Sequence, residues 1–376
     1  MRLAIVHDYL NQYGGAERVL EALHEVFPDA PVYTSLYEPS ALPGHLRTWD
    51  IRTSFLQRIP LSHRYHRALL LLYPAAFESF DLSGYDIVLS ISSAWAKGVI
   101  TPPNTIHVNY CLTPMRFAWN YSEYVERERI GSAARAVLPV ATHYLRLWDV
   151  ATAQRVDRFV AISSVVRSRI QKYYRREADL IYPPVDAEQI PLGTGDGEDF
   201  LVVSRLVPYK RIDLAVAACS RIGAPLTIMG DGRDRAELAA KAGPTVRFLG
   251  HVSDAERSGA LGRCKAFLFP GEEDFGIAPV EAMAAGRPVI AYGGGGALDT
   301  VVDGVTGQLF APQTVDALAE RLTTFDASRY RPEAIRGHAL QFARSRFQRA
   351  IKQYLEEALE QGRNARAFAR PQAPSV

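Results

Sequence analysis

Two glutamates frame a glycine-containing turn in the string FPGEEDFGIAPVEAMAAG, which covers residues 269–286. Glu273 follows a predicted strand, and Glu281 falls in the first turns of a predicted helix. The residues between them bring backbone N–H groups to the helix N-terminus, where anions and sugar oxygens bind. Because a carboxylate accepts from two neighbouring hydroxyls at once, the string predicts a site for a polyhydroxylated, phosphorylated ligand. The alternative is an acidic surface loop followed by a glutamate that interacts favourably with the helix dipole. This alternative explains Glu281, but not the other residues of the string.

Two cations occupy a second strand-to-helix turn, VVSRLVPYKRID at residues 202–213. Arg205 leaves the end of a predicted strand, and Lys210 precedes a predicted helix. A planar guanidinium fork and a point charge together suit a diphosphate. Two solvated surface cations are the alternative. The same type of turn recurs in this half of the chain at Glu273, which favours the diphosphate site over this alternative.

Glycine-rich turns follow two other predicted strands. Gly14 and Gly15 precede the first predicted helix, and four consecutive glycines occupy residues 293–296. Glycine permits close approach of a ligand or of another backbone segment, although a tight strand–helix turn alone also explains the first pair. His251 and Val252 follow a further strand, at a position where the base of a nucleotide could stack.

Elements that position these residues alternate between apolar and amphipathic runs. The predicted strands are residues 3–6, 87–91, 106–111, 158–162, 200–203, 226–228, 246–249, 266–268 and 289–291. The predicted helices are residues 16–26, 163–174, 212–222, 233–242, 254–264 and 279–285. This alternation predicts an α/β fold of parallel sheets with helices on both faces. The Pro183-Pro184 pair marks a boundary between two doubly wound domains, with a ligand cleft between them.

Composition is that of an average globular protein and excludes several classes. The chain has 376 residues, 48% hydrophobic and 22% charged, and a formal charge of +2, which is unlike a strongly basic nucleic-acid binder. Cys111, Cys219 and Cys264 are odd in number and far apart, which indicates thiols in a reducing compartment. The apolar run at residues 3–6 is too short for a signal peptide. We expect a cytoplasmic protein, or one peripheral on the inner face of the cytoplasmic membrane.

Motifs for several other chemistries do not occur. The sequence contains no P-loop, no G-x-G-x-x-G, no G-x-S-x-G and no H-E-x-x-H. An Asp-x-Asp pair is also absent, so a bridging divalent metal has no obvious ligands. We therefore expect no metal and no cofactor, with phosphate charge met by Arg205, Lys210 and helix N-termini.

Residues 56–80 combine several arginines with a dense apolar run. A helical hairpin packed on the first domain is the favoured interpretation. The alternative is an interfacial patch that docks on anionic lipid. Residues 363–376, rich in Ala, Arg and Pro, are expected to be a disordered tail.

Nearly the whole chain resembles the GT-B nucleotide-sugar glycosyltransferases of family 4, a retaining class. The resemblance is carried by EEDFGIAPVEAMAAGRPVIA and SRLVPYK, by DRFVAISSVVRSRIQKYY followed by YPPVD, and by IMGDGRDRAEL. Within that family, GGAERVLEAL, TPMRFAW, LRLWD and GGGGALDTVVDGVTG resemble O-antigen and exopolysaccharide mannosyltransferases that use GDP-mannose.

The resemblance implies an organisation and roles for individual residues. Residues 1–183 are expected to form an acceptor-binding Rossmann-like domain, residues 184–340 a nucleotide-sugar-binding one, and residues 341–362 a helix that crosses back. Arg205 and Lys210 are expected to hold the donor diphosphate. Glu281 is expected to bind the ribose. The remaining donor contacts are expected from Glu273 and the amides of Phe275, Gly276 and Ile277 for the sugar, Gly14 and Gly15 for the diphosphate, and His251 and Val252 for the base.

One position departs from the family pattern. Relatives carry His-Thr-Pro where this chain has Leu112-Thr113-Pro114. Leucine cannot donate a hydrogen bond or transfer a proton. Either Leu112 only alters packing around the sugar or acceptor, or it marks weakened activity or a donor other than mannose. Arg116 is close enough in sequence to contact the sugar or acceptor.

The expected reaction is transfer of a hexose from a nucleotide sugar to an acceptor hydroxyl with retained configuration. The acceptor implied by the resemblance is a lipid-linked or polysaccharide glycan in cell-surface polysaccharide biosynthesis. Catalysis is expected to rest on Arg205, Lys210 and Glu273 rather than on a buried carboxylate pair in the first domain. A UDP-sugar transferase, a GT-B nucleotide-sugar epimerase and a non-catalytic nucleotide-sugar-binding partner are the alternatives.

Overall fold

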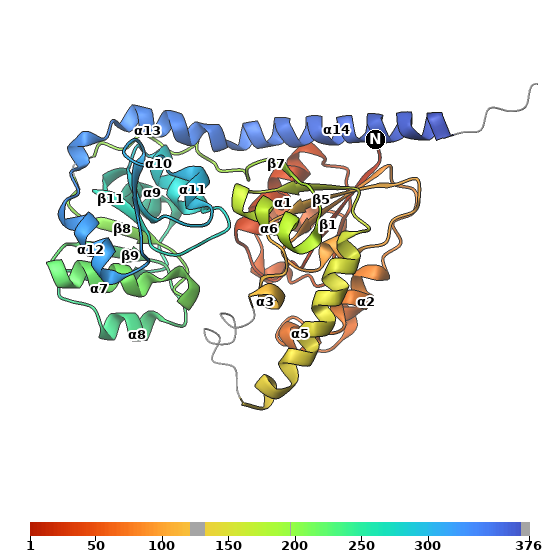
Figure 1. The fold of residues 1–376 in the computed structure, drawn as a ribbon, viewed down its shortest axis with the longest axis horizontal. Helices are drawn as coiled ribbons and strands as arrows, with labels where there is room; N and C mark the ends of the chain where they lie inside the picture. Colours follow the sequence, from red (N-terminus) through yellow and green to blue (C-terminus); the bar gives the residue numbers. More distant parts are fainter. Residues whose placement is uncertain (121–131, 196, 370–376) are drawn as a thin grey trace, which may run out of the picture. The chain divides into compact units, whose positions relative to one another are not determined.

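A computed structural model describes residues 1–120, 132–195 and 197–369. The chain divides into two compact units (Figure 1). Unit 1 comprises Met1–Tyr182 with the chain from Phe347 onward, and unit 2 comprises Pro183–Arg346. Each unit is built on one parallel sheet, in agreement with the predicted pair of doubly wound α/β domains.

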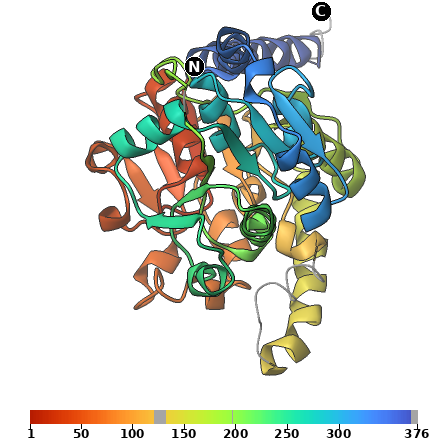
Figure 2. The same ribbon diagram turned by 90° about the vertical axis from the view of Figure 1, so that its left-hand side faces the viewer.

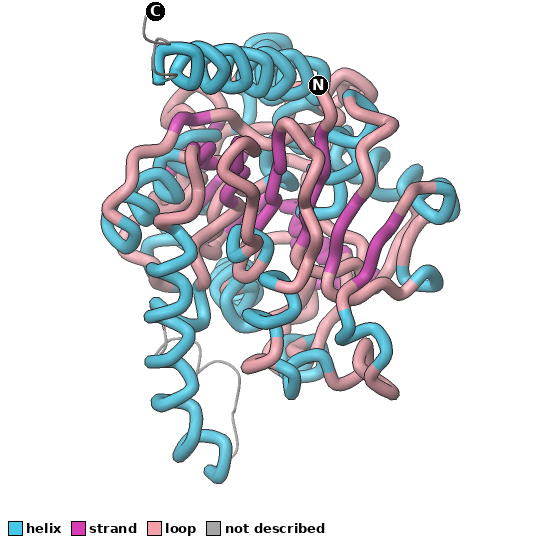
Figure 3. Tube along the Cα trace, turned by 90° about the vertical axis from the view of Figure 1, so that its right-hand side faces the viewer, coloured by secondary structure: helices cyan, strands magenta, loops and turns pink. Residues whose placement is uncertain are grey.

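The sheet of unit 1 has seven parallel strands in the order β3-β2-β1-β4-β5-β6-β7 (Figure 3). The strands are β1 (Leu3–His7), β2 (Val32–Thr34), β3 (Ile51–Thr53), β4 (Ile87–Ser92), β5 (Ile106–Cys111), β6 (Arg158–Ala161) and β7 (Asp179–Leu180). The central strands β1, β4 and β5 are buried along their whole length, as expected for a parallel sheet covered on both faces.

Helices of unit 1 connect these strands and cover the sheet. They are α1 (Gly15–Val26), α2 (Tyr73–Glu78), α3 (Arg116–Trp119), α5 (Ser132–Ala153), α6 (Ser164–Tyr174) and α14 (Arg344–Ala369). Helix α14 belongs to unit 1 from Phe347 onward, where Phe347 packs edge-on against Tyr110 of β5. It extends to Ala369, further than the helix predicted over residues 341–362, and residues 370–376 lie outside the described part of the chain.

The sheet of unit 2 has six parallel strands in the order β10-β9-β8-β11-β12-β13, between two sets of helices (Figure 2). The strands are β8 (Phe200–Val203), β9 (Leu226–Met229), β10 (Val246–Gly250), β11 (Ala266–Phe269), β12 (Val289–Tyr292) and β13 (Gly307–Phe310). The helices are α7 (Ile212–Ile222), α8 (Arg235–Ala240), α9 (Asp254–Arg263), α10 (Ile277–Ala284), α11 (Ala297–Thr300), α12 (Val315–Thr323) and α13 (Pro332–Ala339).

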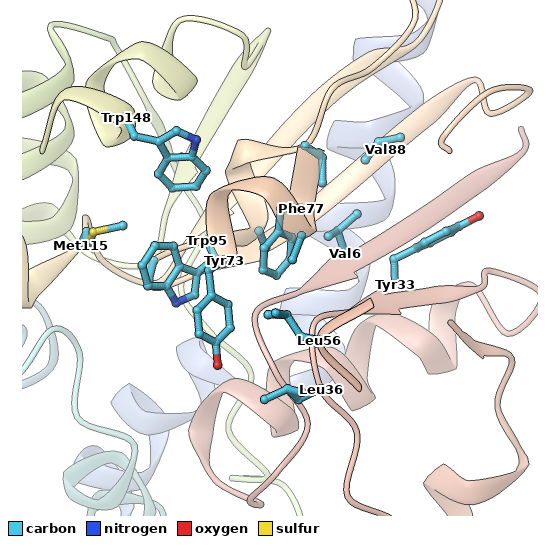
Figure 4. Packing of buried hydrophobic residues seen from close by; sticks show 14 of the residues in the cluster. Val6, Tyr33, Leu36, Leu56, Tyr73, Phe77, Val88, Trp95, Met115 and Trp148 are labelled. Atoms are coloured by element: carbon cyan, nitrogen blue, oxygen red, sulfur yellow. The ribbon is translucent and has the colours of Figure 1, made fainter. Parts of the chain in front are cut away.

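Aromatic and aliphatic side chains pack together in the hydrophobic core on one face of the unit 1 sheet (Figure 4). Tyr73 stacks on Trp95 with ring centroids 4.8 Å apart, and Trp148 lies 5.7 Å from Trp95. Leu56 and Phe77 are fully buried in the same cluster. This packing explains why part of the apolar run at residues 56–80 faces inward.

The helical hairpin expected over residues 56–80 does not form. The segment instead contains two 3₁₀ turns, Phe55–Arg58 and His66–Leu69, followed by the short helix α2. Leu61 has a φ of 58°, in the left-handed region, which interrupts any continuous helix there. Throughout the described residues, no helix is both long and apolar enough to cross a membrane. All three cysteines are buried thiols.

Candidate functional site

The residues predicted to contact a ligand in unit 2 gather where the strand order reverses. Strand β8 lies between β9 and β11. The chain therefore leaves β8 toward one side of the sheet and β11 toward the other, and loops diverge at the carboxyl ends of these two strands. Such a switch point is where doubly wound sheets bind ligands. Arg205 and Lys210 follow β8, and Glu273 follows β11.

Lys210 and Glu273 meet across this switch point in an ion pair between Nζ and Oε1, with the two side chains 15% and 19% exposed. The turn that carries Lys210 lies against Gly271, where an added Cβ would come within 2.8 Å of the Lys210 carbonyl oxygen. Arg205 is exposed, and its guanidinium donates to the Tyr209 hydroxyl at 3.3 Å. The Lys210–Glu273 pair thus joins the two predicted turns in one charged cluster, and Arg205 is exposed in the first of these turns.

The four-glycine turn at residues 293–296 packs against the backbone of the Glu273 loop. The N–H of Gly296 donates to the Glu273 carbonyl at 2.7 Å. A Cβ on Gly296 would lie 2.3 Å from Cα of Phe275, and one on Gly295, where φ is +61°, would lie 2.3 Å from the Glu273 carbonyl oxygen. Close approach of backbone to backbone is therefore the reason these positions require glycine.

Helix α10 begins beside this cluster. Gly276, with a φ of +94°, is its N-cap residue, and no side chain of the described residues caps it. Ile277 is the first helical residue, and Phe275 is buried with its ring 5.5 Å from that of Phe342. The N-terminus of α10 consequently opens at the switch point, beside the Lys210–Glu273 pair, as the sequence predicts.

Glu281 is buried in the second turn of α10, where its carboxylate pairs with Arg257 of α9. His251 and Val252 precede α9 and follow β10, and His251 is exposed. Next to them, the backbone N–H of Gly232 and the guanidinium of Arg235 lower the pKa of Asp231. The sheet order places His251 and Val252 at the end of the edge strand β10, which β9 separates from β8 and the switch point.

The other predicted site residues belong to unit 1. Gly14 is the N-cap residue of α1, and its φ of −157° is extended rather than left-handed. As a glycine, it supplies no side-chain cap to the helix. Leu112 follows β5 and is half-buried, with its N–H bonded to the Ser92 carbonyl at 2.9 Å. Arg116 opens the one-turn helix α3 and is also half-buried. Gly14, Gly15 and Leu112 follow β1 and β5, whose carboxyl ends share one edge of a parallel sheet.

Comparison with known protein families identifies the domain that holds the charged cluster. Residues 186–339 match the family described as glycosyl transferases group 1. Over these residues, unit 2 is similar to the group 1 glycosyl transferases. The match includes Arg205, Lys210, Glu273 and Glu281.

Curated relatives share sequence over about half of their own length. A GDP-mannose-dependent alpha-mannosyltransferase of Mycolicibacterium smegmatis is 37% identical over 200 residues, which is 51% of this chain and 52% of the relative. Glycogen synthase of Mycobacterium tuberculosis is 31% identical over 196 residues, or 47% of this chain and 46% of the relative.

A solved structure extends the similarity over both units. HepE of Anabaena, crystallised in complex with UDP and glucose, has a TM-score of 0.69 and 19% sequence identity, covering 95% of this chain and 99% of its own. At this identity the similarity shows the fold, which is GT-B. The predicted fold class is thereby confirmed.

A buried carboxylate at the end of β1 was not predicted as a site residue. Asp8 follows β1 directly and accepts five hydrogen bonds, from the backbone N–H groups of residues 93–96 and the Ser93 hydroxyl, at 2.7–3.0 Å. It joins the loops after β1 and β4, which flank the point where the unit 1 sheet reverses its order. The polar His7-Asp8 pair that closes an apolar run is the sequence signal for it.

A second pair lies at the end of β1. His7 Nε2 is 3.3 Å from Glu17 Oε1, and both side chains are 2% exposed. Glu17 lies in the first turn of α1, and its Oε2 is 3.4 Å from the position of a Cβ on Gly14. Asp8 and Glu17 are therefore buried carboxylates of unit 1, and the expectation that catalysis does not rest on a carboxylate pair in this domain stays a prediction.

The helix α5 contributes a fully buried aspartate that organises the region after β5. Asp149 forms an ion pair with the equally buried Lys97 and accepts from Trp119 Nε1 at 2.7 Å and from the Tyr174 hydroxyl at 2.9 Å. Burial, together with the Asp149 charge, raises the pKa of Tyr174. Because Trp119 is the last residue of α3, Asp149 fixes the turn on which Arg116 lies.

Proposed function

We propose that the chain is a retaining glycosyltransferase that moves mannose from GDP-mannose to a hydroxyl of a lipid-linked or polysaccharide glycan in cell-surface polysaccharide biosynthesis. The observation that carries this proposal is the charged cluster at the unit 2 switch point. Lys210 and Glu273 pair there beside the N-terminus of α10, the helix that also carries Glu281, inside the segment that matches the group 1 glycosyl transferases.

The donor is held, in this proposal, by the predicted residues of unit 2. Arg205 and Lys210 bind the diphosphate, and Glu281 accepts from the ribose hydroxyls. Glu273 and the N-terminus of α10 bind the sugar, with the amides of Phe275, Gly276 and Ile277 as donors. The position of Lys210 against Glu273 supports this division, because the pair lies between the two turns.

Catalysis follows from stabilising the leaving group. As the glycosidic C–O bond breaks, negative charge grows on the leaving diphosphate, and Arg205 and Lys210 meet that charge. The acceptor hydroxyl forms the new C–O bond and passes its proton to a diphosphate oxygen, which balances the reaction. Leu112 takes no part in proton transfer, since its side chain has no polar atom.

The donor base and sugar rest on the relatives. The mannosyltransferase of Mycolicibacterium smegmatis is described as GDP-mannose-dependent and supports a guanosine donor. HepE is described as bound to UDP and glucose, which supports a UDP-sugar as the second candidate. A nucleotide-sugar epimerase would instead consume the donor without an acceptor, and a non-catalytic partner would bind it without turnover.

Exposed side chains between residues 58 and 72 support a membrane-bound acceptor. Leu61, Tyr65 and Leu71 are 55%, 54% and 51% exposed, and Arg58 and Arg64 are exposed beside them in the sequence. Apolar side chains near cations favour docking on anionic lipid. Purified protein is expected to sediment with vesicles that contain phosphatidylglycerol, and less so as salt increases. Sedimentation that is absent or independent of salt would contradict this part of the proposal.

Turnover of the purified enzyme tests the proposed chemistry. GDP-mannose, UDP-glucose and a lipid-linked acceptor extract are supplied, and released nucleotide diphosphate and glycosylated acceptor are measured. Arg205→Ala and Lys210→Ala are each expected to lower turnover at least a hundredfold, as removal of one charge-stabilising group does elsewhere. Arg221→Ala is a matched control, because its guanidinium pairs with the exposed Asp316 on the surface. Near-normal turnover in both site variants would refute the proposed role.

A further inference from the structure

The loop after β4 wraps its backbone around the buried carboxylate of Asp8. The Ser93 N–H, the Ser93 hydroxyl and the Ala94 N–H donate to Oδ2 at 2.8, 2.8 and 3.0 Å. The N–H groups of Trp95 and Ala96 donate to Oδ1 at 2.9 and 2.7 Å. A run of consecutive N–H groups is a site for an anion, and Asp8, which is 4% exposed, occupies it from within the chain. Because a carboxylate has about four lone-pair sites, these donors saturate Asp8.

Residues 93–98, the 93–98 turn, join Asp8 to the position that departs from the family pattern. Leu112, which is predicted to lie near the sugar or acceptor, donates its backbone N–H to the carbonyl of Ser92 at 2.9 Å. Ser92 ends β4 and directly precedes the turn. The backbone that Asp8 holds therefore holds Leu112 as well.

The same turn is joined to α3 from its other end. Lys97 pairs with Asp149 of α5, and both side chains are buried. Asp149 accepts from the indole of Trp119, the last residue of α3, and Arg116 is the first residue of this helix. A shift of the turn would therefore disturb Leu112 and Arg116 together, the two residues predicted near the sugar or acceptor.

We propose that Asp8 is a positioning residue for the acceptor, which sets Leu112 and α3 in place through the 93–98 turn. It does not itself touch a substrate, because its carboxylate is buried and saturated by the turn. The inference rests on the proposed function and on the predicted binding of the acceptor to unit 1. Without the carboxylate, the N–H groups of the turn lose their buried partner, and the turn rearranges to recover hydrogen bonds.

Turnover as a function of acceptor concentration tests the proposal. Wild type and Asp8→Ala are supplied with saturating GDP-mannose or UDP-glucose and with a dilution series of the lipid-linked acceptor extract. Asp8→Ala is expected to lower kcat/KM for the acceptor at least about tenfold, because the displaced turn misplaces the acceptor hydroxyl. Calorimetric binding of GDP or UDP is expected to change less than about twofold, because the substitution leaves unit 2 untouched. Damage to the whole protein would lower both.

Chemical rescue separates the missing carboxylate from lost packing. Sodium formate supplies a carboxylate to the cavity of Asp8→Ala. Compared with equal sodium chloride, formate is expected to restore part of the acceptor kcat/KM and to raise the urea midpoint followed by tryptophan fluorescence. Asp8→Asn leaves no such cavity and points an amide N–H₂ group at the N–H groups of the turn, so its loss of kcat/KM is expected to resist rescue. Equal effects of formate and chloride on Asp8→Ala would overturn the role of the carboxylate.

Asp86→Asn is a matched control for loss of a carboxylate that binds backbone. Asp86 accepts the Arg2 N–H at 2.7 Å before β1, at the opposite edge of the same sheet, so the acceptor kcat/KM is expected to stay unchanged. An unchanged acceptor kcat/KM in Asp8→Ala, or a loss that nucleotide binding shares equally, would contradict the positioning role. A wild-type protein without turnover would overturn the proposed function and the acceptor role together, whereas the formate effect on the urea midpoint is measured without turnover. If Asp8→Ala does not fold, Ser93→Ala removes one donor and is expected to lower the acceptor kcat/KM about threefold.

Discussion

Asp149→Asn is expected to destabilise unit 1 strongly. The substitution keeps the shape of the side chain but removes the charge that faces Lys97, and Lys97 is 1% exposed. A buried ammonium without its counter-ion costs about 3–5 kcal/mol. A domain is stable by about 5–15 kcal/mol, so a large part of the stability of unit 1 depends on this one carboxylate.

Intrinsic tryptophan fluorescence during urea unfolding measures this effect in unit 1 alone. All four tryptophans, Trp49, Trp95, Trp119 and Trp148, belong to unit 1. With a slope near 3 kcal/mol per molar urea, the midpoint is expected to fall by about 1–2 M. Asp50→Asn, which breaks the exposed pair with Arg52, is the control and is expected to cost less than about 1 kcal/mol.

A double-mutant cycle separates the charge from the packing. Lys97→Met combined with Asp149→Asn removes both charges and is expected to be more stable than the sum of the two single losses predicts. A single Asp149→Asn variant within 1 kcal/mol of wild type, or additive losses in the cycle, would refute the reasoning. Asp149 also anchors the Trp119 end of α3, the turn that carries Arg116.

Three further predictions concern a buried histidine, a crowded glycine and a glycine with open space around it. Burial, and then the charge of Lys97, lowers the pKa of His107 from 6.5 to about 3. Below pH 6.5, the His107 side chain binds a proton in the unfolded chain but not in the folded chain. The free energy of unfolding should therefore decrease by up to about 1.4 kcal/mol for each unit by which the pH is lowered from 6.5 to 3. Urea midpoints at pH 7 and pH 5 should differ less in His107→Asn, and an equal difference would contradict the assignment. Gly296→Ala should destabilise unit 2 by about 1–3 kcal/mol, because its Cβ would lie 2.3 Å from Phe275 Cα. Gly337→Ala in α13 meets no atom within 4 Å and should stabilise it by about 0.5–1 kcal/mol, as circular dichroism during urea unfolding would show.

Strands with continuous apolar runs were predictable from the sequence. Residues 200–203 are apolar throughout and form β8 with the predicted bounds; residues 106–111 form β5 with the predicted bounds as well, and are buried throughout although His107 and Asn109 alternate with apolar residues. The short strands β2 and β3 were missed. Each has three residues, and β3 is largely exposed at the sheet edge, so neither produces a long apolar signal.

The location of the candidate site was predictable in outline, but its contacts were not. Spacing placed Lys210 and Glu273 after two strands, and the reversal of strand order brings those strand ends together. The pairing of Arg257 with Glu281 joins side chains 24 positions apart on two helices, and it depends on how α9 packs against α10. Local sequence patterns carry no information about such packing, so this residue could not be found before the fold was known.

Calorimetric titration with GDP, GDP-mannose, UDP and UDP-glucose tests the central claim most directly, with the wild-type chain beside Lys210→Ala and the surface control Lys241→Ala. Lys241 pairs with Glu237 at an exposed position, and neither residue is a predicted ligand contact. Loss of the Lys241 side chain should therefore leave nucleotide binding unchanged. The account predicts that the wild type binds GDP and GDP-mannose, that Lys210→Ala weakens both at least tenfold, and that Lys241→Ala binds as the wild type does. Wild-type protein that binds none of the four nucleotides, or equal binding by Lys210→Ala, would contradict it.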